Sequence, residues 1–391
     1  MKNIVLSDTG LHKNLLPLSY TRPVAEMRTG IFTNAERWEK LSSIKPNYQT
    51  EKYLSIKHPN ANSEKALVIN GSVIADKELA NAALNLKKGS LVKNNKPIAA
   101  IKNSPDFNFD ILPEPIIEYK SEVIFIENTY DIFSYAGHCL SIDFELITQN
   151  RTSQKISSTN TVFGKHPLFI EEGVKIEAAI INTNNGPVYL GKNSEVMEGS
   201  MIRGPFALGE NSQVKMGAKI YGPTIIGPHS RVGGELNNIV VFGFSNKAHD
   251  GFLGNSVIGE WCNLGADTNN SNLKNNYVKV KLWNYEHERF TNTDLQFCGL
   301  IMGDHSKTGI NTMFNTGTVV GVSANIFGDG FPRNFIPSYS WGGANGFQTF
   351  KLENAFEVAE VVMKRRDLNF SEEDKDILSH IFEISKTYRK F

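Results

Sequence analysis

Aliphatic residues recur at every sixth position through the middle of this chain. In the first register these residues are Leu190, Val196, Ile202, Leu208, Val214, Ile220, Ile226 and Val232. The fifth residue of most of these hexads is small, namely Ser194, Ser200, Ser212, Ala218, Thr224 and Ser230. A second register follows at Met302, Thr308, Phe314, Val320 and Ile326. A period of six matches neither the 3.6-residue period of a helix nor the simple alternation of a strand, so it indicates an internal structural repeat.

A triangular coil accounts for this pattern. Each hexad forms one short strand and one corner, and three hexads make a turn of about eighteen residues. The aliphatic side chain points inward, and a small residue is needed where the walls converge. Stacked coils pair their backbone groups along the whole solenoid. The pattern therefore predicts a left-handed parallel β-helix from about residue 161 to about residue 326, an exception to the right-handed crossover rule. The alternative is a β-sandwich, but its strands alternate with period two and turn every 8–12 residues or so.

The first 150 residues have a different pattern. Short apolar runs predict buried strands at residues 4–6, 66–69 and 123–126, and helices are expected at residues 33–41 and 75–86. This alternation is typical of an α/β layer fold. Near the other end, residues 352–388 are expected to be helical and to cap the solenoid. The expected domains are 1–150 (α/β), 151–340 (β-helix) and 341–391 (helical extension).

Bulk composition excludes several roles. Acidic and basic residues balance at 41 each, so bulk charge does not point to a nucleic-acid or membrane partner. The three cysteines, Cys139, Cys262 and Cys298, have no metal-site spacing, and none is expected to bind a metal. The first apolar run is too short for a signal peptide, and no stretch is long enough to span a bilayer. We therefore expect a cytoplasmic protein.

Three segments resemble a known family. They read L-L-P-L-S-Y-T-R-P at residues 15–23, V-I-N-G at 68–71 and S-N-K-A-H-D-G-F-L-G at 245–254. Together with the order of the two halves, they resemble the GlmU type. Those bifunctional proteins are N-acetylglucosamine-1-phosphate uridylyltransferases and glucosamine-1-phosphate N-acetyltransferases. The similarity is closest to the shortened GlmU-like sugar nucleotidyltransferases of Bacteroidetes-type bacteria.

This resemblance implies an acetyltransferase site. It assigns His249 as the general base and Glu235 as the group that orients it, because an attacking amine must lose a proton near neutral pH. It assigns the sugar and acyl contacts to Asn263, Asn272, Lys247 and Phe252. It assigns acyl-CoA contacts to Ala266, Ser306 and Ala324. Phe252 stands where the family has tyrosine, so the acceptor could differ from glucosamine-1-phosphate.

The N-terminal half matches its family pattern less well. Only Gly10 stands for the glycine pair of the family's phosphate loop, and Ser72 stands where an aspartate would hold Mg²⁺. Lys13, Arg22 and Arg28 are the candidates for phosphate binding. Two interpretations are open: a working nucleotidyltransferase that needs Mg²⁺, or a degenerate domain kept for packing and assembly.

Three functions follow as hypotheses. The first is an acetyl-CoA-dependent acyltransferase acting on an amino-sugar phosphate or sugar nucleotide. The second is a nucleotidyltransferase whose β-helix only assembles and regulates it. The third is a non-catalytic sugar-nucleotide sensor. The resemblance also implies a homotrimer with acyl-CoA between subunits.

Two segments keep two interpretations each. Residues 273–296 interrupt the coil and form either a loop over a site or a trimer contact. The basic run at residues 364–366 either contacts CoA phosphates or lies on a solvated helix face.

Overall fold

The computed structural model describes residues 3–60, 65–104 and 107–391. By internal contacts the chain forms two compact units. The first comprises residues 1–15, 21–27 and 32–128, and the second comprises residues 16–20, 28–31 and 129–391. Two short N-terminal segments therefore fold as part of the second unit.

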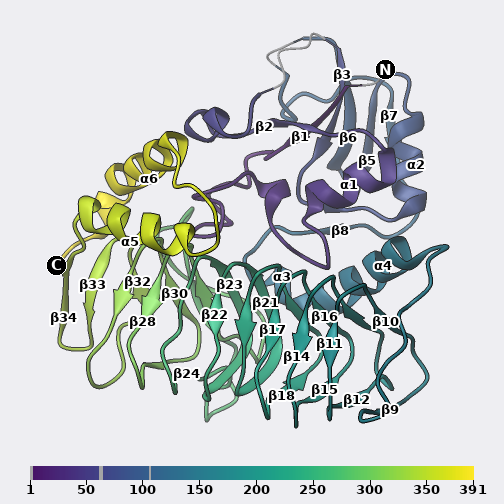
Figure 1. Ribbon diagram of the computed structural model, residues 1–391. Coiled ribbons are helices and arrows are strands. Elements are labelled where there is room, and N and C mark those ends of the chain that lie inside the picture. The colour runs from purple at the N-terminus through teal and green to yellow at the C-terminus, as the bar shows by residue number, and fades with distance from the viewer. Residues whose placement is uncertain (1–2, 61–64, 105–106) are drawn as a thin grey trace. The chain divides into compact units, whose positions relative to one another are not determined.

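The first unit is an α/β domain built on one mixed sheet (Figure 1). The strand order is β2-β1-β3-β6-β5-β7. The strands are β1 (Ile4–Ser7), β2 (Asn47–Gln49), β3 (Ala66–Asn70), β5 (Ser90–Lys93), β6 (Lys96–Lys102) and β7 (Ile116–Glu118). The pairs β1–β2, β1–β3 and β5–β7 are parallel, and β3–β6 and β5–β6 are antiparallel. A two-stranded pair, β4 (Val73–Ile74) and β8 (Ile124–Phe125), lies beside it.

The expected strands and helices of this domain are present. Its helices are α1 (Asn34–Ser42), α2 (Lys77–Asn85) and the short 3-10 helices η1 (Val24–Glu26) and η2 (Lys52–Ile56). Helix α1 begins at a capping box in which Thr33 and Glu36 bond each other's backbone N–H groups. The core between sheet and helices contains Ile4, Leu6, Trp38, Ile69 and Leu79, all buried.

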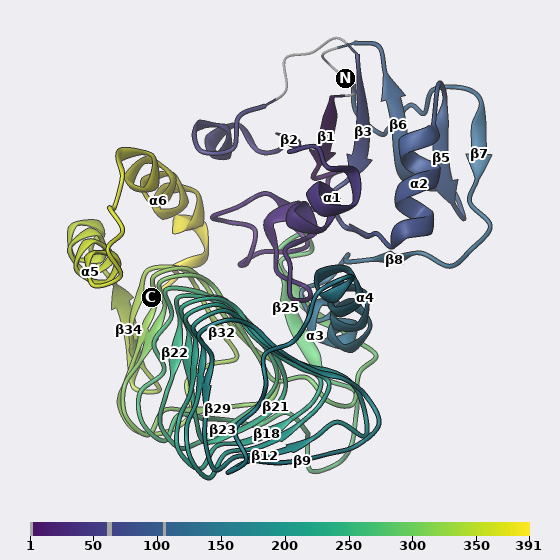
Figure 2. The ribbon, with the colours of Figure 1, turned by 45° about the vertical axis from the view of Figure 1, so that its right-hand side comes forward.

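The second unit is the predicted solenoid, and it has three faces (Figure 2). We call them faces A, B and C. Face A contains β9 (Thr161–Phe163), β12 (Ile180–Asn182), β15 (Met201–Arg203), β18 (Lys219–Tyr221), the first halves of β21 (Glu235–Gly243) and β23 (Phe252–Glu260), β24 (Asn269–Asn270) and β29 (Met313–Phe314). Face B contains β10 (Leu168–Ile170), β13 (Val188–Leu190), β16 (Phe206–Leu208), β19 (Thr224–Ile226), the second halves of β21 and β23, β27 (Leu300–Met302), β30 (Thr318–Val320) and β32 (Phe335–Ile336).

Face C completes each coil. It contains β11 (Lys175–Ile176), β14 (Glu195–Val196), β17 (Gln213–Val214), β20 (Arg231–Val232), β22 (Asn246–Lys247), β28 (Lys307–Thr308), β31 (Asn325–Ile326) and β33 (Ser340–Gly343). Asn263 bridges β22 and β28. Register partners in the regular coils are eighteen positions apart, as Val196 and Val214 are, which is the spacing that the hexads predict.

The two repeat registers occupy the positions predicted for them. All aliphatic residues from Leu190 to Val232 are fully or almost fully buried, and so are the small residues from Ser194 to Ser230. They form one continuous core that runs from Ile170 to Ile336. The predicted fold class, a left-handed hexapeptide β-helix with an α/β domain before it, is therefore confirmed.

The solenoid extends further than the hexads indicate. The expected end was Ile326, but β32 and β33 still pair with β30 and β31. Pro337 and the glycines after it break the hexad pattern without ending the coil. The interrupting segment 273–296 contains an antiparallel hairpin, β25 (Lys281–Asn284) and β26 (Arg289–Asn292). Trp283 of this hairpin stacks on Phe335 of β32 with ring centroids 4.2 Å apart.

The remaining elements pack on the solenoid. Helices α3 (Asp131–Ser134) and α4 (Ala136–Thr148) precede it, and β33 forms a hairpin with β34 (Gly346–Thr349). The expected helical extension is present as α5 (Leu352–Lys364), α6 (Glu372–Ile384) and the short η3 (Ser385–Tyr388). The Tyr339 hydroxyl donates to the backbone oxygen of Leu378 at 2.7 Å, which ties α6 to the last coil.

Loss of one inward-pointing side chain is expected to destabilise the solenoid. We predict that Ile226→Ala lowers the free energy of unfolding by about 2–5 kcal/mol, because it leaves a cavity in a packed core. Ile310→Ala is the matched control, since Ile310 is 71% exposed. Urea denaturation of both variants checks the prediction, and equal losses in the two would contradict it.

Candidate functional site

His249 lies on a short loop at one corner of the solenoid. The loop joins β22 on face C to β23 on face A, and we call this the C–A corner. His249 and Asp250 are exposed, and Gly251 follows with φ +111°. A Cβ at Gly251 would lie 2.3 Å from the backbone oxygen of Thr268, so only glycine lets the chain turn here against the next coil. The imidazole is thus accessible and sits on a tightly constrained loop.

Lys247 holds this loop from inside. Its ammonium is buried and donates to the backbone oxygens of His249 at 2.5 Å and Asp250 at 2.8 Å. Burial lowers the pKa of Lys247 to about 8. The resemblance assigns Lys247 to substrate binding, but its ammonium is engaged with the protein backbone. In this chain Lys247 therefore positions the loop that carries His249.

Glu235 lies on face A, beside Phe252 in the sheet register. Its carboxylate Oε2 is 3.9 Å from Nζ of Lys219, and both side chains are partly exposed. Within the described residues no hydrogen bond joins Glu235 to His249. Sequence spacing brings the two residues to adjacent coils, and the orienting role of Glu235 stays a prediction.

The residues assigned to the sugar and acyl group lie on different faces. Asn263 is exposed on face C between Asn246 and Lys307. Asn272 donates its side-chain amide to Asn255 Oδ1 at 2.8 Å, at the far corner of the coil. One chain therefore does not bring Asn263 and Asn272 together.

The residues assigned to acyl-CoA are mostly interior. Ser306 and Ala324 are fully buried, and the Ser306 hydroxyl donates to the backbone oxygen of Gly321 at 2.6 Å. Ala266 is half-buried at the C–A corner, where its backbone oxygen accepts from the Asn311 N–H. Neither Ser306 nor Ala324 exposes a group to a ligand within this chain, so their assignment to acyl-CoA stays a prediction.

The phosphate candidates of the N-terminal half lie apart from one another. Arg28 belongs to the second unit, where it is buried and its Nε donates to the backbone oxygen of Phe242 at 2.9 Å. A further bond joins its guanidinium to the Ile31 oxygen. Arg28 is thus tied to backbone carbonyls, as in a structural role. Arg22 is buried in the first unit, and Lys13 is exposed there.

The two turns of the first unit that resemble nucleotide-binding turns are closed by their own side chains. Asp8, after β1, accepts from the Val24 N–H at 2.8 Å and from Thr50 Oγ1 at 2.6 Å. Asn70 Oδ1, after β3, accepts from the buried Ser72 hydroxyl at 2.8 Å. In the described parts of the chain no three His, Cys, Asp or Glu residues are grouped to hold a metal ion. The residues present do not fit a magnesium site of the family type.

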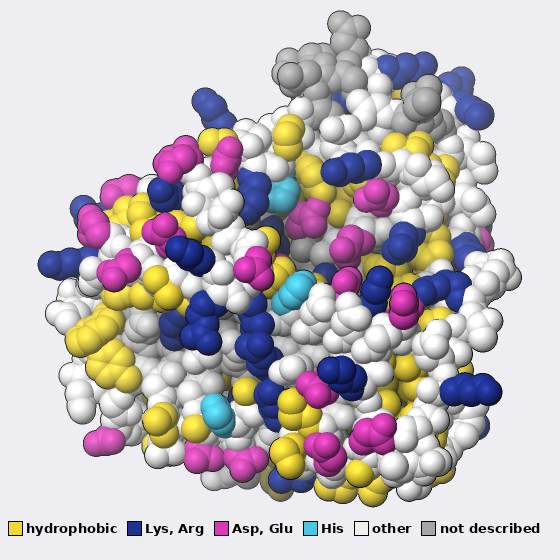
Figure 3. All heavy atoms as spheres, in the orientation of Figure 1, with side chains coloured by type: hydrophobic (Ala, Val, Ile, Leu, Met, Phe, Trp, Pro, Cys, Tyr) yellow, Lys and Arg dark blue, Asp and Glu magenta, His cyan; other side chains and the backbone are white. Residues whose placement is uncertain are grey.

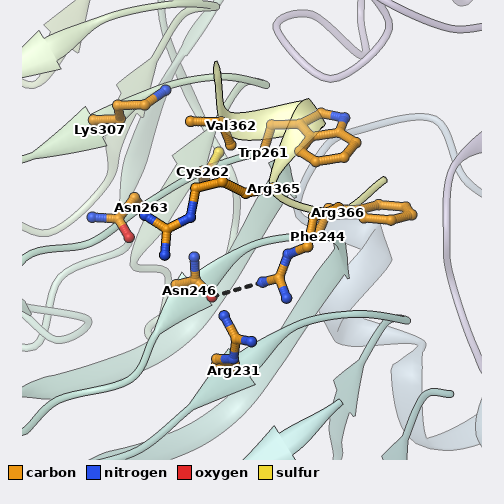
Figure 4. A pocket seen from close by; sticks show the side chains of 10 residues that line it. All are labelled: Arg231, Phe244, Asn246, Trp261, Cys262, Asn263, Lys307, Val362, Arg365 and Arg366. Atoms are coloured by element: carbon orange, nitrogen blue, oxygen red, sulfur yellow. Dashed lines mark hydrogen bonds between the residues drawn. The ribbon is translucent and has the colours of Figure 1, made fainter. Parts of the chain in front are cut away.

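A pocket of about 410 Å³ opens on face C, under helix α5 (Figure 4). Its lining residues are Arg231, Phe244, Asn246, Trp261, Cys262, Asn263, Lys307, Val362, Arg365 and Arg366. Figure 3 shows Lys and Arg side chains gathered over this part of the solenoid. The sequence indicated Asn263 and the basic run at 364–366, but not that they meet Arg231 and Lys307. No local pattern predicts where a distant helix docks.

Residues 4–152 match the family of sugar nucleotidyl transferases. The resemblance to GlmU-like proteins that the sequence motifs indicate is confirmed. Along the described residues no helix is long and apolar enough to cross a membrane.

Particular relatives share limited regions with this chain. The bifunctional protein GlmU of Methanocaldococcus jannaschii is 40% identical over 73 residues, which are 19% of this chain and 17% of that protein. The bifunctional sugar-1-phosphate nucleotidylyltransferase/acetyltransferase of Sulfurisphaera tokodaii is 30% identical over 200 residues, 50% of this chain and 46% of that one. The match thus spans less than half of each relative.

A solved structure matches part of this chain. The UDP-N-acetylglucosamine acyltransferase of Francisella novicida is 14% identical, with 60% of this chain and 79% of that chain covered and a TM-score of 0.36. The fold of this chain is defined by its own parallel strand pairing.

The buried ammonium of Lys247 should make stability depend on pH. Its pKa is about 8 in the folded chain and ordinarily 10.5, so between these values the unfolded chain binds more protons. Relative to Lys247→Met, the wild type should therefore gain stability as pH rises from about 8 towards 10.5. Urea denaturation across that range measures the difference.

The pKa of Lys307 is also about 8. Because Lys307 is present in both proteins, the stability difference between wild type and Lys247→Met reports on Lys247 alone. Lys192→Met, which removes a half-exposed lysine, serves as the control and should track the wild type at every pH. If the difference in unfolding free energy between wild type and Lys247→Met did not change with pH, the lowered pKa of Lys247 would be contradicted.

Proposed function

We propose that this protein is a transferase, an acetyl-CoA-dependent N-acetyltransferase that acts on an amino-sugar phosphate or a nucleotide-linked amino sugar. The observation that carries the proposal is the exposed His249 on its constrained corner loop, held from inside by Lys247. The motif around His249 supports the same chemistry, as does the similarity to the Sulfurisphaera protein, which is named as an acetyltransferase.

The mechanism needs one base and one oxyanion donor. The amine of the acceptor sugar attacks the thioester carbonyl of acetyl-CoA, and neutral His249 takes a proton from that nitrogen. The oxyanion of the tetrahedral intermediate accepts a hydrogen bond from a backbone N–H of a neighbouring coil. Collapse of the intermediate breaks the C–S bond and releases the CoA thiolate, which takes the proton from His249. The products are the N-acetylated sugar and free CoA.

Lys247 and Glu235 act through His249 in this proposal. Lys247 fixes the backbone that presents the imidazole. Glu235 would orient the ring, which requires its carboxylate to leave Lys219 and turn towards the C–A corner. Asn263, Asn272 and Phe252 remain the proposed acceptor contacts, and the half-buried Ala266 remains the proposed contact to the donor. Ser306 and Ala324 are fully buried in the coils below face C.

Two other functions remain as alternatives. A nucleotidyltransferase whose β-helix only serves assembly would need Mg²⁺ at a turn where Ser72 replaces the family carboxylate. A non-catalytic sensor would bind sugar nucleotides without turnover. The accessible His249 favours the acyltransferase over both.

We further propose that the chain forms a homotrimer through face A. This face exposes Val162, Phe163, Ile180, Met201 and Tyr221, each between 40 and 46% exposed, around a groove of about 520 Å³. Contiguous exposed apolar residues of this kind mark protein contacts. The C–A corner adjoins face A, so a partner subunit packed there would lie beside His249 and could complete the acceptor site.

Removal of the imidazole should remove acetyl transfer. We expect His249→Ala to lower kcat by about 10²–10⁴-fold, which is the usual contribution of a general base. His138→Ala, which removes an exposed histidine of α4, is the matched control and should keep wild-type turnover. Free thiol release from acetyl-CoA with amino-sugar phosphates and UDP- or dTDP-amino sugars measures both. Equal turnover in the two variants would refute the role of His249.

Charges placed on face A should break the assembly. The double variant Met201→Glu/Tyr221→Glu should convert a trimer into monomers, because two carboxylates would be desolvated in the contact. Val361→Glu changes a residue of α5 that is 56% exposed and should leave the trimer intact. Light scattering at micromolar concentration distinguishes the states. A monomeric wild type would contradict both the proposed trimer and the proposed site between subunits.

A further inference from the structure

Two separate parts of the chain line the pocket under α5. One side is face C of the solenoid, which contributes Arg231, Asn246, Asn263 and Lys307. The other side is the last turn of α5 and the residues after it, which contribute Val362, Arg365 and Arg366. Figure 4 shows the guanidinium groups of the three arginines lying around Asn246. Segments more than a hundred residues apart thus build one cavity.

Arg231, Arg366 and Lys307 of this pocket have neutral hydrogen-bond partners. Arg231 Nε lies 3.2 Å from Gln213 Oε1, Arg366 Nη2 lies 3.4 Å from Asn246 Oδ1, and Lys307 Nζ lies 2.8 Å from the His305 oxygen. In the described chain none of them, nor Arg365, forms an ion pair with a carboxylate. Like charges held together in a partly dry site repel one another unless an anion joins them.

Burial disfavours the charged form of two of these groups, and like charges add to this effect at Arg366. The pKa of Arg366 is lowered first by burial and then by the charges of Arg231 and Arg365. Burial lowers the pKa of Lys307 to about 8. A cation at the C-terminal end of a helix interacts favourably with the helix dipole, and this explains the position of the exposed Lys364. It does not explain why Arg231 and Lys307 of the solenoid meet the same end of α5.

Stacked rings form the apolar wall of the pocket. At the corner between faces B and C, the rings of His229, Phe244, Trp261 and His305 stack in a column, with centroids 4.8, 4.4 and 6.2 Å apart. Phe244 and Trp261 both line the pocket, and Val362 of α5 contributes a further apolar side chain. Inorganic phosphate would leave this apolar surface unused. The pocket suits a ligand that has an anionic end and an apolar or aromatic end.

We propose that this pocket binds the nucleoside diphosphate part of a nucleotide. Its phosphates lie among Arg231, Arg365 and Arg366, since guanidinium groups match phosphate oxygens in bidentate pairs. Its base and ribose lie against Phe244, Trp261 and Val362, with the amides of Asn246 and Asn263 as hydrogen-bond partners. The volume falls within the range of roughly 300–1,000 Å³ that small-molecule sites occupy.

Two sources supply this chemistry. A coenzyme A molecule carries a phosphorylated adenosine diphosphate, and a sugar nucleotide carries a nucleoside diphosphate. The site lies at one end of β22 and His249 at the other, so the inference does not depend on acetyl transfer. It holds for an acyltransferase and for a sugar-nucleotide sensor.

The test is calorimetric titration of the full chain with ADP, CoA, UDP-N-acetylglucosamine and inorganic pyrophosphate at low ionic strength. Arg365→Gln/Arg366→Gln should weaken ADP binding at least about tenfold. Lys364→Gln is the matched control, because it removes a positive charge from the same helix end but not from the pocket, and should bind within about twofold of wild type. Val362→Trp, which fills the pocket and keeps every charge, should also abolish binding.

Each outcome decides a part of the proposal. Tighter binding of CoA than of UDP-N-acetylglucosamine assigns the pocket to the acyl donor, and the reverse order assigns it to a sugar nucleotide. Pyrophosphate binding as tight as ADP would overturn the nucleoside part. Absence of ADP binding in folded wild type, or equal loss in Lys364→Gln, would overturn the site itself.

Discussion

Each coil of this protein depends on the same packing constraint. An aliphatic side chain must fill the inside of the prism, and the residue beside each corner must be small enough for two walls to meet. From Leu190 to Val232 every hexad meets the first condition and all but the one with Phe206 meet the second, and the inward aliphatic side chains belong to one buried cluster. The core is therefore a column, and the stability of one coil depends on its neighbours. This column also keeps successive residues of a face in line, so Arg231, Asn246, Asn263 and Lys307 lie in neighbouring rows.

The residues at the corners of the coils differ from one coil to the next. Left-handed backbone is required between faces B and C, and Asn193 and Asn211 meet this requirement with the residue type that tolerates it. Further along, His229, Phe244, Trp261 and His305 take the same conformation, with φ between 52 and 61°. Bulky residues in that region cost about 1–3 kcal/mol each, which ring stacking of about 0.5–1.5 kcal/mol per pair partly offsets. The aromatic corner lies where the pocket forms, and this places strained backbone next to a candidate binding site.

Periodic features could be predicted from the sequence, and features that depend on docking could not. The hexads located the inward residues, and the apolar runs located the strands and helices of the α/β domain. The end of the solenoid was placed too early, at Ile326, because Pro337 and nearby glycines hide the last coil. The sequence makes Arg28 a candidate for phosphate binding but does not predict that it donates to the backbone oxygen of Phe242. It also does not predict the bond from Lys247 to the His249 oxygen or the contact of Arg366 with Asn246. Each of these contacts depends on how the folded chain brings the groups together.

We propose that acetyl transfer takes place on the β-helix and that the α/β domain, in which Ser72 stands where the family has a metal-binding carboxylate, forms no pyrophosphate. The most direct measurement is a paired assay of the wild-type protein for free thiol release from acetyl-CoA with an amino-sugar phosphate, and for pyrophosphate formation from a nucleoside triphosphate with a sugar 1-phosphate and Mg²⁺. The account predicts thiol release that depends on the acceptor sugar, with no pyrophosphate formed. Pyrophosphate formation without thiol release would contradict it and would assign the activity to the N-terminal half.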